Sequence, residues 1–285
     1  MERLLIIDGN NLLFQMFFGM PSKIYNKSGE TIHATIGFIS FVLKQVKLLN
    51  ATKVCVVFDQ DGSVERKEEY SGYKENRFSD WDSLNPDEVP FYEEEKIKRC
   101  LNYLGIKYID SINMEADDVI ASLAILFSIK HQVIISSFDS DFFQLINKNT
   151  SVLRYRGKAS VMYDEKSFVE KMGFTPNKYV FYKSLVGDSS DNIKGIKGIG
   201  KARATNIVNS CSSFSEFLAK KSTILLKSMS LNIEECQSIY YRNEKIIKLK
   251  YIDIIVYEID DFKYNETRVK MTNSEVLSAC NIFNE

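Results

Sequence analysis

The sequence predicts an α/β fold in which a mostly parallel, twisted sheet is flanked by helices. Four short apolar runs, Leu4 to Ile7, Val54 to Phe58, Tyr108 to Ile109 and Val133 to Ser136, alternate with segments of helical period. Continuous apolar runs are typical of parallel strands that are buried on both faces. Strands that alternate with helices along the chain favour the α/β arrangement.

Three helices are expected between these strands. Apolar residues spaced three or four apart mark the first, from Phe38 to Leu49. The second runs from about Pro90 to Leu104, because proline is favoured in the first helical turn and Gly105 follows as a stop signal. The third begins after Glu115 and carries its apolar face from Val119 to Phe127.

The rest of the chain is expected to form a second, mainly helical region, so that an α/β domain spans residues 1–165 and a helical region spans 166–285. A glycine-rich turn at 195–200 interrupts the helices, and the run YIDIIVY at 251–257 predicts one strand. Residues 78–89 lack periodicity and hold the one tryptophan, so we expect a surface excursion between helices there.

The composition narrows the class of protein. Five cysteines, at least 25 residues apart and without a CxxC pair, predict reduced thiols and argue against a zinc knuckle or a disulfide framework. The first apolar run is too short for a signal peptide, and no segment approaches the roughly 20 apolar residues of a membrane span. We therefore expect a cytoplasmic monomer without a membrane partner. Because the chain has two histidines, any bound metal would be held by oxygen ligands.

Acidic residues follow the predicted strands where their carboxyl ends meet. Asp8 ends the first strand, Asp59 ends the second, and Asp139 and Asp141 follow the VIISSF run. Ligands of open parallel sheets bind beyond the carboxyl ends of the strands, so these four acids should converge on one crevice.

Two further segments add five acids. Glu115, Asp117 and Asp118 lie at the start of a predicted helix, where the helix dipole favours anions. Asp188 and Asp191 are three residues apart, which places them on one helical face. Each acid alone could be an ordinary turn or cap residue. Nine carboxylates in one crevice, however, would repel one another unless cations were bound.

The acids therefore predict a metal site. Oxygen ligands without histidine or cysteine favour Mg²⁺ or Mn²⁺, and this many acids can hold two ions. Two such ions activate a water molecule and stabilise the leaving oxygen when a phosphodiester is hydrolysed.

Cationic and aromatic residues between 66 and 77 predict contacts with nucleic acid. At 100° per residue, one helical face collects Arg66, Tyr70, Tyr73, Lys74 and Arg77. Cations interleaved with tyrosines suit phosphates and stacked, unpaired bases. The alternative is a solvated helix stabilised by ion pairs.

The glycine-rich turn almost satisfies the GxxxxGK[ST] nucleotide-binding pattern. Ala202 stands where that pattern needs a hydroxyl, and no strand precedes the turn, so we reject a nucleotide site. A hairpin between two helices can instead offer backbone N–H groups to DNA phosphates, although a plain turn is the alternative. The candidate DNA contacts are Lys194, Gly195, Lys197, Gly198, Gly200, Lys201 and Arg203.

At these positions the sequence resembles the 5′ nuclease or flap endonuclease family, which includes the 5′→3′ exonuclease domain of bacterial DNA polymerase I and stand-alone phage and bacterial 5′ exonucleases. The matching blocks occur in the family's order over about two hundred residues. They are IIDGNN (6–11), FDQDG (58–62), YKENR (73–77), EADD (115–118), DSDFFQL (139–145), GDSSDN (187–192) and GIKGIGKARA (195–204).

The resemblance implies a PIN-like fold with a helical arch over about 62–95 and a helix-three-turn-helix DNA-binding motif over about 180–215. The first metal site that it implies consists of Asp8, Asp59, Glu115 and Asp117. The second consists of Asp139, Asp141 and Asp188, with Asp118 and Asp191 assisting through water. Contacts to the scissile phosphate and the unpaired end are implied for Tyr73, Lys74 and Arg77. Backbone carbonyls near 195–200 would bind K⁺ beside duplex DNA. The family usually has arginine where this chain has Gln15, and prolines where it has Lys194 and Lys197.

These features predict a 5′→3′ exonuclease and flap endonuclease that uses two Mg²⁺ or Mn²⁺ ions and acts on DNA with 5′ flaps or 5′ ends. It would cut near junctions of single strand and duplex, leaving a 5′-phosphate and a 3′-hydroxyl. The catalytic residues would be Asp8, Asp59, Asp117, Lys74 and Arg77, with the two cations offsetting developing charge. No polymerase domain follows in this sequence, so a DNA polymerase is expected to act in trans.

Two alternatives stay open. One is a nuclease that removes RNA primers from RNA–DNA hybrids, and the other is a non-catalytic protein that binds DNA junctions. The nine acids argue against the second alternative, because negative charge facing phosphates weakens binding.

The overall charge agrees with DNA binding once the acids are located. The chain carries 37 Lys and Arg against 38 Asp and Glu, a balance that by itself argues against nucleic acid. Without the nine candidate ligands, 37 basic residues face 29 acidic ones, a net charge of +8. We therefore expect an acidic metal crevice beside a basic binding surface.

Overall fold

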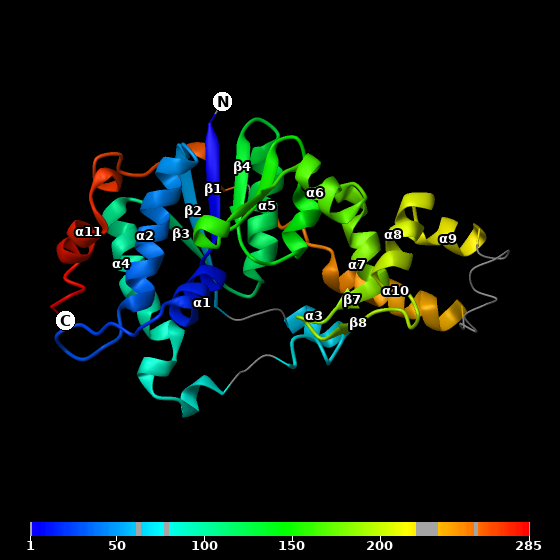
Figure 1. Ribbon diagram of the computed structural model, residues 1–285, viewed down its shortest axis with the longest axis horizontal. Helices are drawn as coiled ribbons and strands as arrows, with labels where there is room; N and C mark the ends of the chain where they lie inside the picture. The colour runs from blue at the N-terminus through cyan, green and yellow to red at the C-terminus, as the bar shows by residue number, and fades with distance from the viewer. Residues whose placement is uncertain (1, 61–63, 77–79, 221–232, 254–255, 285) are drawn as a thin grey trace.

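A computed structural model describes residues 2–60, 64–76, 80–220, 233–253 and 256–284 (Figure 1). Its centre is a six-stranded sheet of order β3-β2-β1-β4-β5-β6, in which β1 to β5 are parallel and β6 is antiparallel to β5. The strands are β1 (Arg3–Asp8), β2 (Lys53–Asp59), β3 (Lys107–Ser111), β4 (Gln132–Ser136), β5 (Thr150–Arg154) and β6 (Val161–Tyr163). The expected mostly parallel sheet is confirmed, and each of the four apolar runs lies in one strand.

Helices cover both faces of the sheet, because alternate residues of each buried strand point to opposite sides. Leu5 and Ile7 of β1 face one core, whereas Leu4 and Ile6 face the other. The first core is covered by α1 (Gly9–Gly19), α2 (His33–Leu48), α4 (Glu94–Leu104) and α11 (Asn273–Ala279), and the second by α5 (Ala116–Ser128) and α6 (Glu165–Met172) (Figure 1). The three expected helices are therefore α2, α4 and α5. Gly105 follows α4 with a left-handed φ of 68° and ends it, as predicted.

The described chain between residues 179 and 247 is mainly helical. Its helices are α7 (Tyr179–Val186), α8 (Lys201–Ser210), α9 (Phe214–Lys220) and α10 (Ile233–Ile247). A short antiparallel hairpin, β7 (Gly187–Asp188) and β8 (Ile193–Lys194), separates α7 from α8. Asn243 of α10 donates hydrogen bonds to the carbonyls of Ser184 (3.0 Å) and Lys194 (2.9 Å), so α10 holds α7 and the hairpin together.

Short elements complete the described chain. They are α3 (Val64–Glu69) and the 3-10 helices η1 (Trp81–Ser83), η2 (Pro86–Glu88), η3 (Pro90–Glu93), η4 (Asp141–Leu145), η5 (Gly157–Ala159), η6 (Pro176–Lys178), η7 (Ile259–Phe262) and η8 (Arg268–Lys270). Within the described ranges, no helix combines the length and the apolar character that a membrane span needs.

The prediction of one helix carrying residues 66–77 is wrong. The helix α3 ends at Glu69, and residues 71–76 form turns in which Lys74 has a left-handed φ of 55°. A left-handed residue interrupts the helical progression of side chains, so the cations and tyrosines do not share one face. Arg77 lies outside the described residues.

The strand predicted over 251–257 is not found either. The structure describes residues 251–253 and 256–257 of this segment, and none of them belongs to a strand. The backbone amides of Lys250 and Ile252 donate hydrogen bonds to the side chains of Asp118 and Ser122 on α5, each at 2.8 Å. These amides are therefore used by a helix surface, and the segment runs across α5 as an extended connection.

A glycine at the start of the hairpin should be essential for stability. Gly187 has a φ of 78°, and a Cβ there would come closer than 3.0 Å to the backbone of Ile193 and Gly195. We expect Gly187→Ala to lower the free energy of unfolding by about 2 to 4 kcal/mol, measured by urea denaturation with circular dichroism. The control is Gly19→Ala, where a Cβ meets nothing within 4 Å. Equal effects of the two substitutions would contradict this prediction.

Candidate active site

A cavity of about 750 Å³ opens where the carboxyl ends of β1, β2 and β4 meet. Asp8 ends β1, Asp59 ends β2, Asp139 follows β4, and Asp117 lies in the first turn of α5; all four line this cavity. The parallel topology thus brings together acids that are far apart in the sequence, as the strand-end pattern predicts.

Asp8 is positioned by the sharp passage from β1 into α1. Its side chain caps α1 by accepting a hydrogen bond from the amide of Asn11 (3.1 Å), and it accepts a second from the hydroxyl of Ser137 (2.7 Å). Only glycine can follow it, since a Cβ at Gly9 would lie 2.6 Å from the ring of Phe58. Asp8 therefore caps α1, as an ordinary turn or cap residue would, and it also lines the acidic cavity.

Two asparagines after Asp8 hold the neighbouring strand ends. The amide of Asn10 donates to the carbonyl of Asp59 (3.1 Å) and accepts from its N–H (2.9 Å), while Asn11 accepts from the N–H of Phe138 (3.0 Å). The loops after β2 and β4 are thereby tied to α1. These roles were not predicted from the sequence, although two asparagines in the helical turn after a strand-end acid were a usable signal.

A second group of acids lies beside the first. Asp141 at the start of η4, Asp188 in β7 and Asp191 in the hairpin place carboxylate oxygens within 4.8 Å of one another. Asp139 connects the two groups, because it lines the first cavity and accepts a hydrogen bond from the N–H of Asp141 (2.7 Å). The resemblance grouped Asp139 with the second set, and the structure also brings it to Asp8 and Asp117.

A lysine that the sequence analysis missed enters the second group. The ammonium of Lys183 on α7 contacts Asp141, lies 2.5 Å from Asp188 and 3.2 Å from the hydroxyl of Ser140. The Lys183 residue is only 4% exposed.

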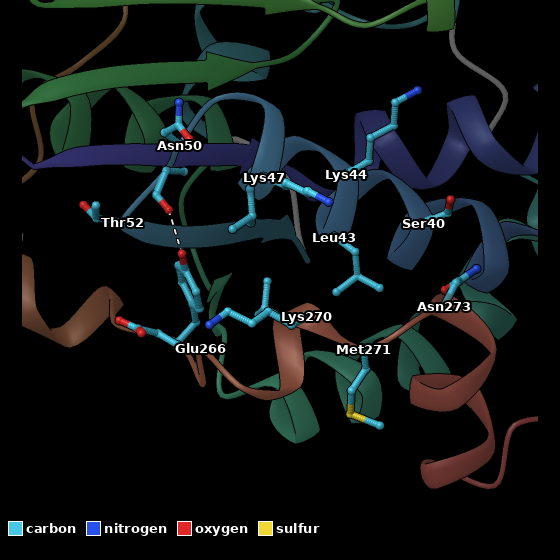
Figure 2. A pocket seen from close by; sticks show the side chains of 14 residues that line it. Ser40, Leu43, Lys44, Lys47, Asn50, Thr52, Glu266, Lys270, Met271 and Asn273 are labelled. Carbon is cyan, nitrogen blue, oxygen red and sulfur yellow. Dashed lines mark hydrogen bonds between the residues drawn. The ribbon is translucent and has the colours of Figure 1, made fainter.

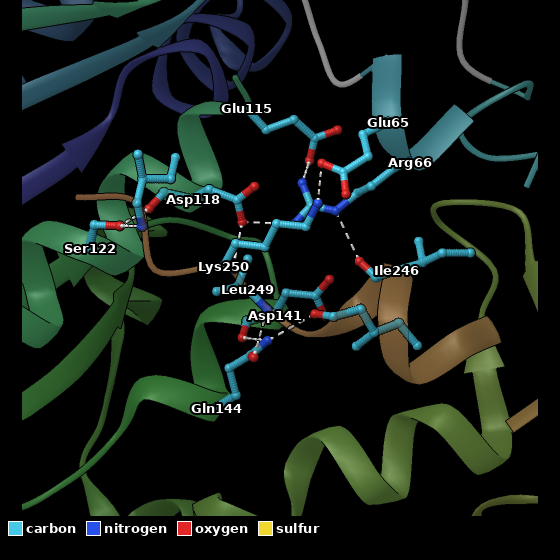
Figure 3. A network of polar contacts seen from close by, with 12 residues as sticks. Glu65, Arg66, Glu115, Asp118, Ser122, Asp141, Gln144, Ile246, Leu249 and Lys250 are labelled. Atoms are coloured by element: carbon cyan, nitrogen blue, oxygen red, sulfur yellow. Dashed lines mark hydrogen bonds and ion pairs between the residues drawn. The ribbon is translucent and has the colours of Figure 1, made fainter. Parts of the chain in front are cut away.

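Glu115 and Asp118 meet a buried arginine (Figure 3). The guanidinium of Arg66 contacts Glu115, donates to Asp118 (2.7 Å) and to the carbonyl of Ile246 (3.0 Å), and the residue is 3% exposed. Arg66 was predicted to contact DNA, whereas the structure directs its guanidinium to buried acids. Its charge is buried in ion pairs because α3 packs against α5 and α10.

The turn after α3 also reaches Glu115. The hydroxyl of Tyr73 and the ammonium of Lys74 each lie 3.2 Å from the carboxylate of Glu115. The N–H of Lys74 donates to the carbonyl of Asp191 (3.0 Å), which ties the turn to the hairpin. Tyr73 is buried, so its ring offers no exposed stacking surface, and the face of Tyr70 is covered by the guanidinium of Arg242 at 4.4 Å. Lys74 lines the acidic cavity, as its predicted contact with phosphate requires.

The glycine-rich turn presents cations to solvent. Ile196 and Ile199 are buried and hold the turn against the helices, and Gly198 has a left-handed φ of 85°. Its carbonyl accepts a hydrogen bond from Arg203 (2.7 Å), and a Cβ at Gly195 would collide with the backbone of Val186. The exposed residues of the turn and of the first turn of α8 include Lys194, Lys197, Gly198, Gly200, Lys201 and Arg203.

The charges of the two groups are consistent with cation binding. Burial raises the pKa of Asp8 to about 6, and repulsion from Asp139 and Asp59 adds to the rise, while hydrogen bonds oppose it. Burial and the charge of Asp139 likewise hold the pKa of Asp117 well above its usual value. A divalent cation would relieve both effects, and an all-carboxylate donor set suits hard cations. The residues therefore fit a divalent metal site.

Basic side chains lie beside the other acids and change their pKa values. Burial opposes ionisation of Glu115, yet Lys74 and Arg66 bring its pKa below the usual value. Burial also opposes ionisation of Asp188, yet the ammonium of Lys183 brings its pKa below the usual value. Burial raises the pKa of Asp141 in spite of the same ammonium. Glu115 and Asp188 are thus ionised with protein cations as partners.

A second cavity, of about 680 Å³, lies at the opposite end of the sheet, between α2 and the segment around η8 (Figure 2). Lys44, Lys47 and Lys270 border it, and the hydroxyl of Tyr264 donates to the carbonyl of Ala51 (2.7 Å). None of the nine candidate acids lines this cavity.

Family models match nearly the whole chain. The model described as the N-terminal resolvase-like domain of 5′-3′ exonuclease matches residues 3–173, and the one described as the C-terminal SAM fold of 5′-3′ exonuclease matches 174–270. A 5′-3′ exonuclease of Aquifex aeolicus is 30% identical over 97% of this chain and 89% of the relative. DNA polymerase I of Caldicellulosiruptor bescii is 29% identical over 96% of this chain and 36% of the polymerase, so the chain spans about a third of that protein.

Solved structures share the fold. A bacteriophage T5 flap endonuclease, in a pseudo-enzyme–product complex with DNA and metal ions, matches with a TM-score of 0.72 and 21% identity over 98% of this chain and 100% of its own. The catalytic core of Rad2 in complex with DNA substrate matches with a TM-score of 0.54 and 20% identity over 98% of this chain and 92% of its own.

Divalent cations should stabilise the protein in a pH-dependent manner. The pKa of Asp8 is 3.8 in an unfolded chain and about 6 in the fold, so this group stabilises the metal-free protein at low pH and loses that contribution as pH rises through about 6. A cation that binds the ionised acid should therefore raise the melting temperature more at about pH 7.5 than at about pH 5. Differential scanning fluorimetry with and without Mg²⁺ measures this. An equal shift at both pH values, or an unchanged pH dependence in Asp8→Asn, would contradict it.

Arg66 should be a determinant of stability. We expect Arg66→Met to lower the free energy of unfolding by about 3 to 5 kcal/mol, because Glu115 and Asp118 would stay buried without the guanidinium. Lys67→Met changes an exposed cation of the same helix and should alter it by less than about 0.5 kcal/mol. Urea denaturation of both variants measures these changes. Equal changes in the free energy of unfolding would show that Arg66 has only a surface role.

Proposed function

Because the chain belongs to the 5′-3′ exonuclease family, we propose that it is a metal-dependent 5′→3′ exonuclease and flap endonuclease that hydrolyses DNA near junctions of single strand and duplex. The observation that carries this proposal is the convergence of two acid groups at the carboxyl edge of the sheet, next to Lys74. Binding proteins gain nothing from acids that face phosphates, whereas nucleases need them to hold cations.

The proposed cofactors are two Mg²⁺ or Mn²⁺ ions. Asp8, Asp59, Asp117 and Asp139 would hold one of them, and Asp141, Asp188 and Asp191 the other. Glu115 and Asp118, which are paired with Arg66, would contribute through water or through their charge. When bound, the ions supply activation of water and stabilisation of the leaving oxygen.

The side chains around the cavity would orient the substrate and stabilise its charge. Lys74 lies in the cavity wall and would offset the negative charge that develops on the scissile phosphate. Arg77 would do the same from the unpaired side, a role that rests on the sequence. As the bond from water oxygen to phosphorus forms, the bond to the 3′ oxygen breaks, which leaves a 5′-phosphate and a 3′-hydroxyl.

Aromatic rings form the opposite wall of the cavity. Phe14, Trp81 and Phe91 line it, with ring centroids 5.4 to 5.7 Å apart in edge-to-face contacts. This apolar wall would exclude bulk water and so strengthen the electrostatic interactions of the site. Residues 78–89 were expected to form a surface excursion between helices, and within the described part of it Trp81 also packs on Phe14 of α1.

Duplex DNA would be bound at the glycine-rich turn. Lys194, Lys197, Lys201 and Arg203 are exposed there and would contact phosphates without reading base sequence. Carbonyls of residues 195–200 are the proposed K⁺ site, and the helix-three-turn-helix of the family is the proposed framework. A DNA polymerase is the proposed partner, because the relatives of the chain include DNA polymerase I.

Removing one acid of the second group should separate cleavage from binding. We expect Asp188→Asn to slow cleavage of a 5′-labelled flap in Mg²⁺ by about a hundredfold or more, with flap binding nearly unchanged by fluorescence anisotropy. Glu170→Gln, at an exposed acid of α6, is the matched control and should cleave normally. Unchanged cleavage by Asp188→Asn would refute the assignment.

The substrate comparison tests the alternatives. We expect the wild-type protein to cut a DNA flap, and comparison with a blunt duplex divides endonuclease from exonuclease activity. A marked preference for a 5′ RNA segment of the same sequence would favour primer removal. Binding without cleavage in Mg²⁺, Mn²⁺ and Co²⁺ would favour the non-catalytic junction binder.

A further inference from the structure

The second acid group contains a protein cation at its centre. The Nζ atom of Lys183 contacts one oxygen of Asp141 and lies 2.5 Å from an oxygen of Asp188. Oxygens of Asp141, Asp188 and Asp191 lie within 4.8 Å of one another. A divalent ion of the Mg²⁺ or Mn²⁺ type binds carboxylate oxygens at about 2.1 Å. An ion that bound the Asp141 and Asp188 oxygens now in contact with Nζ would therefore compete with the ammonium for them.

The surrounding structure keeps Lys183 close to this position. Its backbone belongs to α7, whose next residue, Ser184, accepts a hydrogen bond from Asn243 of α10 (3.0 Å). The side chain nevertheless has other partners within reach. The hydroxyl of Ser140 lies 3.2 Å from Nζ, and the ring centroid of Tyr179 lies 5.9 Å away. The ammonium could thus leave the carboxylates without losing every favourable contact.

We propose that Lys183 is a built-in cation that occupies the second acid group and must be displaced from Asp141 and Asp188 before a second divalent ion can bind. This inference rests on the proposed two-ion function. Lys183 neutralises part of the charge of Asp141 and Asp188, so these two acids have a cationic partner in the absence of a second ion. The same contact lowers the affinity for that ion. Lys183 is therefore a positioning residue that sets when the second ion binds.

The proposal has a consequence for substrate binding. A second ion that binds weakly to the free protein gains further oxygen ligands when a DNA phosphate enters the cavity. Binding of the second ion and binding of substrate would then strengthen each other, because each supplies contacts for the other. Before substrate arrives, the protein would bind one ion tightly and the second weakly, and substrate would tighten binding of the second.

Two substitutions of Lys183 should change the affinity for the second ion in opposite directions. An opposite charge near a carboxylate changes its affinity for a cation by roughly one to three powers of ten. Lys183→Met should therefore bind a second Mn²⁺ at least about tenfold more tightly than the wild type. Lys183→Arg should bind it more weakly, because a guanidinium can bridge two carboxylates and is harder to displace. Electron paramagnetic resonance of free Mn²⁺ measures stoichiometry and affinity on the DNA-free protein.

The control is Lys166→Met, which removes the same charge from a side chain that is 86% exposed and pairs with Glu170. It should leave both Mn²⁺ affinities unchanged. If the wild type binds no Mn²⁺, the proposed function fails. If the wild type binds Mn²⁺ and both Lys183 variants match its second-ion affinity, only the present proposal fails. If Lys183→Met does not fold, Lys183→Arg decides: weaker binding of the second ion supports the proposal, and equal or tighter binding overturns it.

Discussion

The site depends on one electrostatic constraint, which is that carboxylates gathered at the carboxyl edge of a parallel sheet must be neutralised. The topology makes the gathering unavoidable, since β1, β2 and β4 are neighbours and each is followed by an acid. Gathering these acids disfavours their ionised forms, as Asp8 and Asp117 show: burial and repulsion from neighbouring acids hold their pKa values above the usual range. Elsewhere the protein supplies its own cations, Arg66, Lys74 and Lys183. Much of the architecture around the cavity serves to bring these three side chains to the acids.

These cations come from segments that also hold the molecule together. Arg66 links α3 to α5 through its ion pairs and to α10 through the carbonyl of Ile246. The turn containing Lys74 is attached to the hairpin twice, by the amide of Lys74 on Asp191 and by the side chain of Asn192 on the carbonyl of Gly72 (2.8 Å). A movement of this turn would shift contacts of both acid groups. If substrate binds at the turn as proposed, its binding and the occupation of the acids by cations would be physically coupled.

The parts that the sequence predicts are those that depend on short-range patterns. Four apolar runs identified β1 to β4, and the acids at or just after the ends of β1, β2 and β4 located the cavity. β5 and β6 were missed because β5 holds only two apolar residues between polar ones and β6 is only three residues long. The predicted helical face from Arg66 to Arg77 assumed a helix that continues beyond Glu69, whereas the helix ends at that residue. Lys183 could not be recognised, since its partners lie in η4 and β7 and a lysine on a short helix is ordinarily solvated.

The choice of cation at each acid group has a physical rationale. A guanidinium is planar and offers several fixed donors, so Arg66 can bind Glu115, Asp118 and a backbone carbonyl at once, and nothing smaller could replace it. An ammonium is a compact point charge on a flexible stem, so it can reach the same carboxylate oxygens as a metal ion and can also move away from them. Lys183 therefore matches the second acid group as an exchangeable cation, whereas Arg66 forms a permanent part of the framework. The protein thus separates the charge that it must always neutralise from the charge that it can offer to a metal ion when substrate is present.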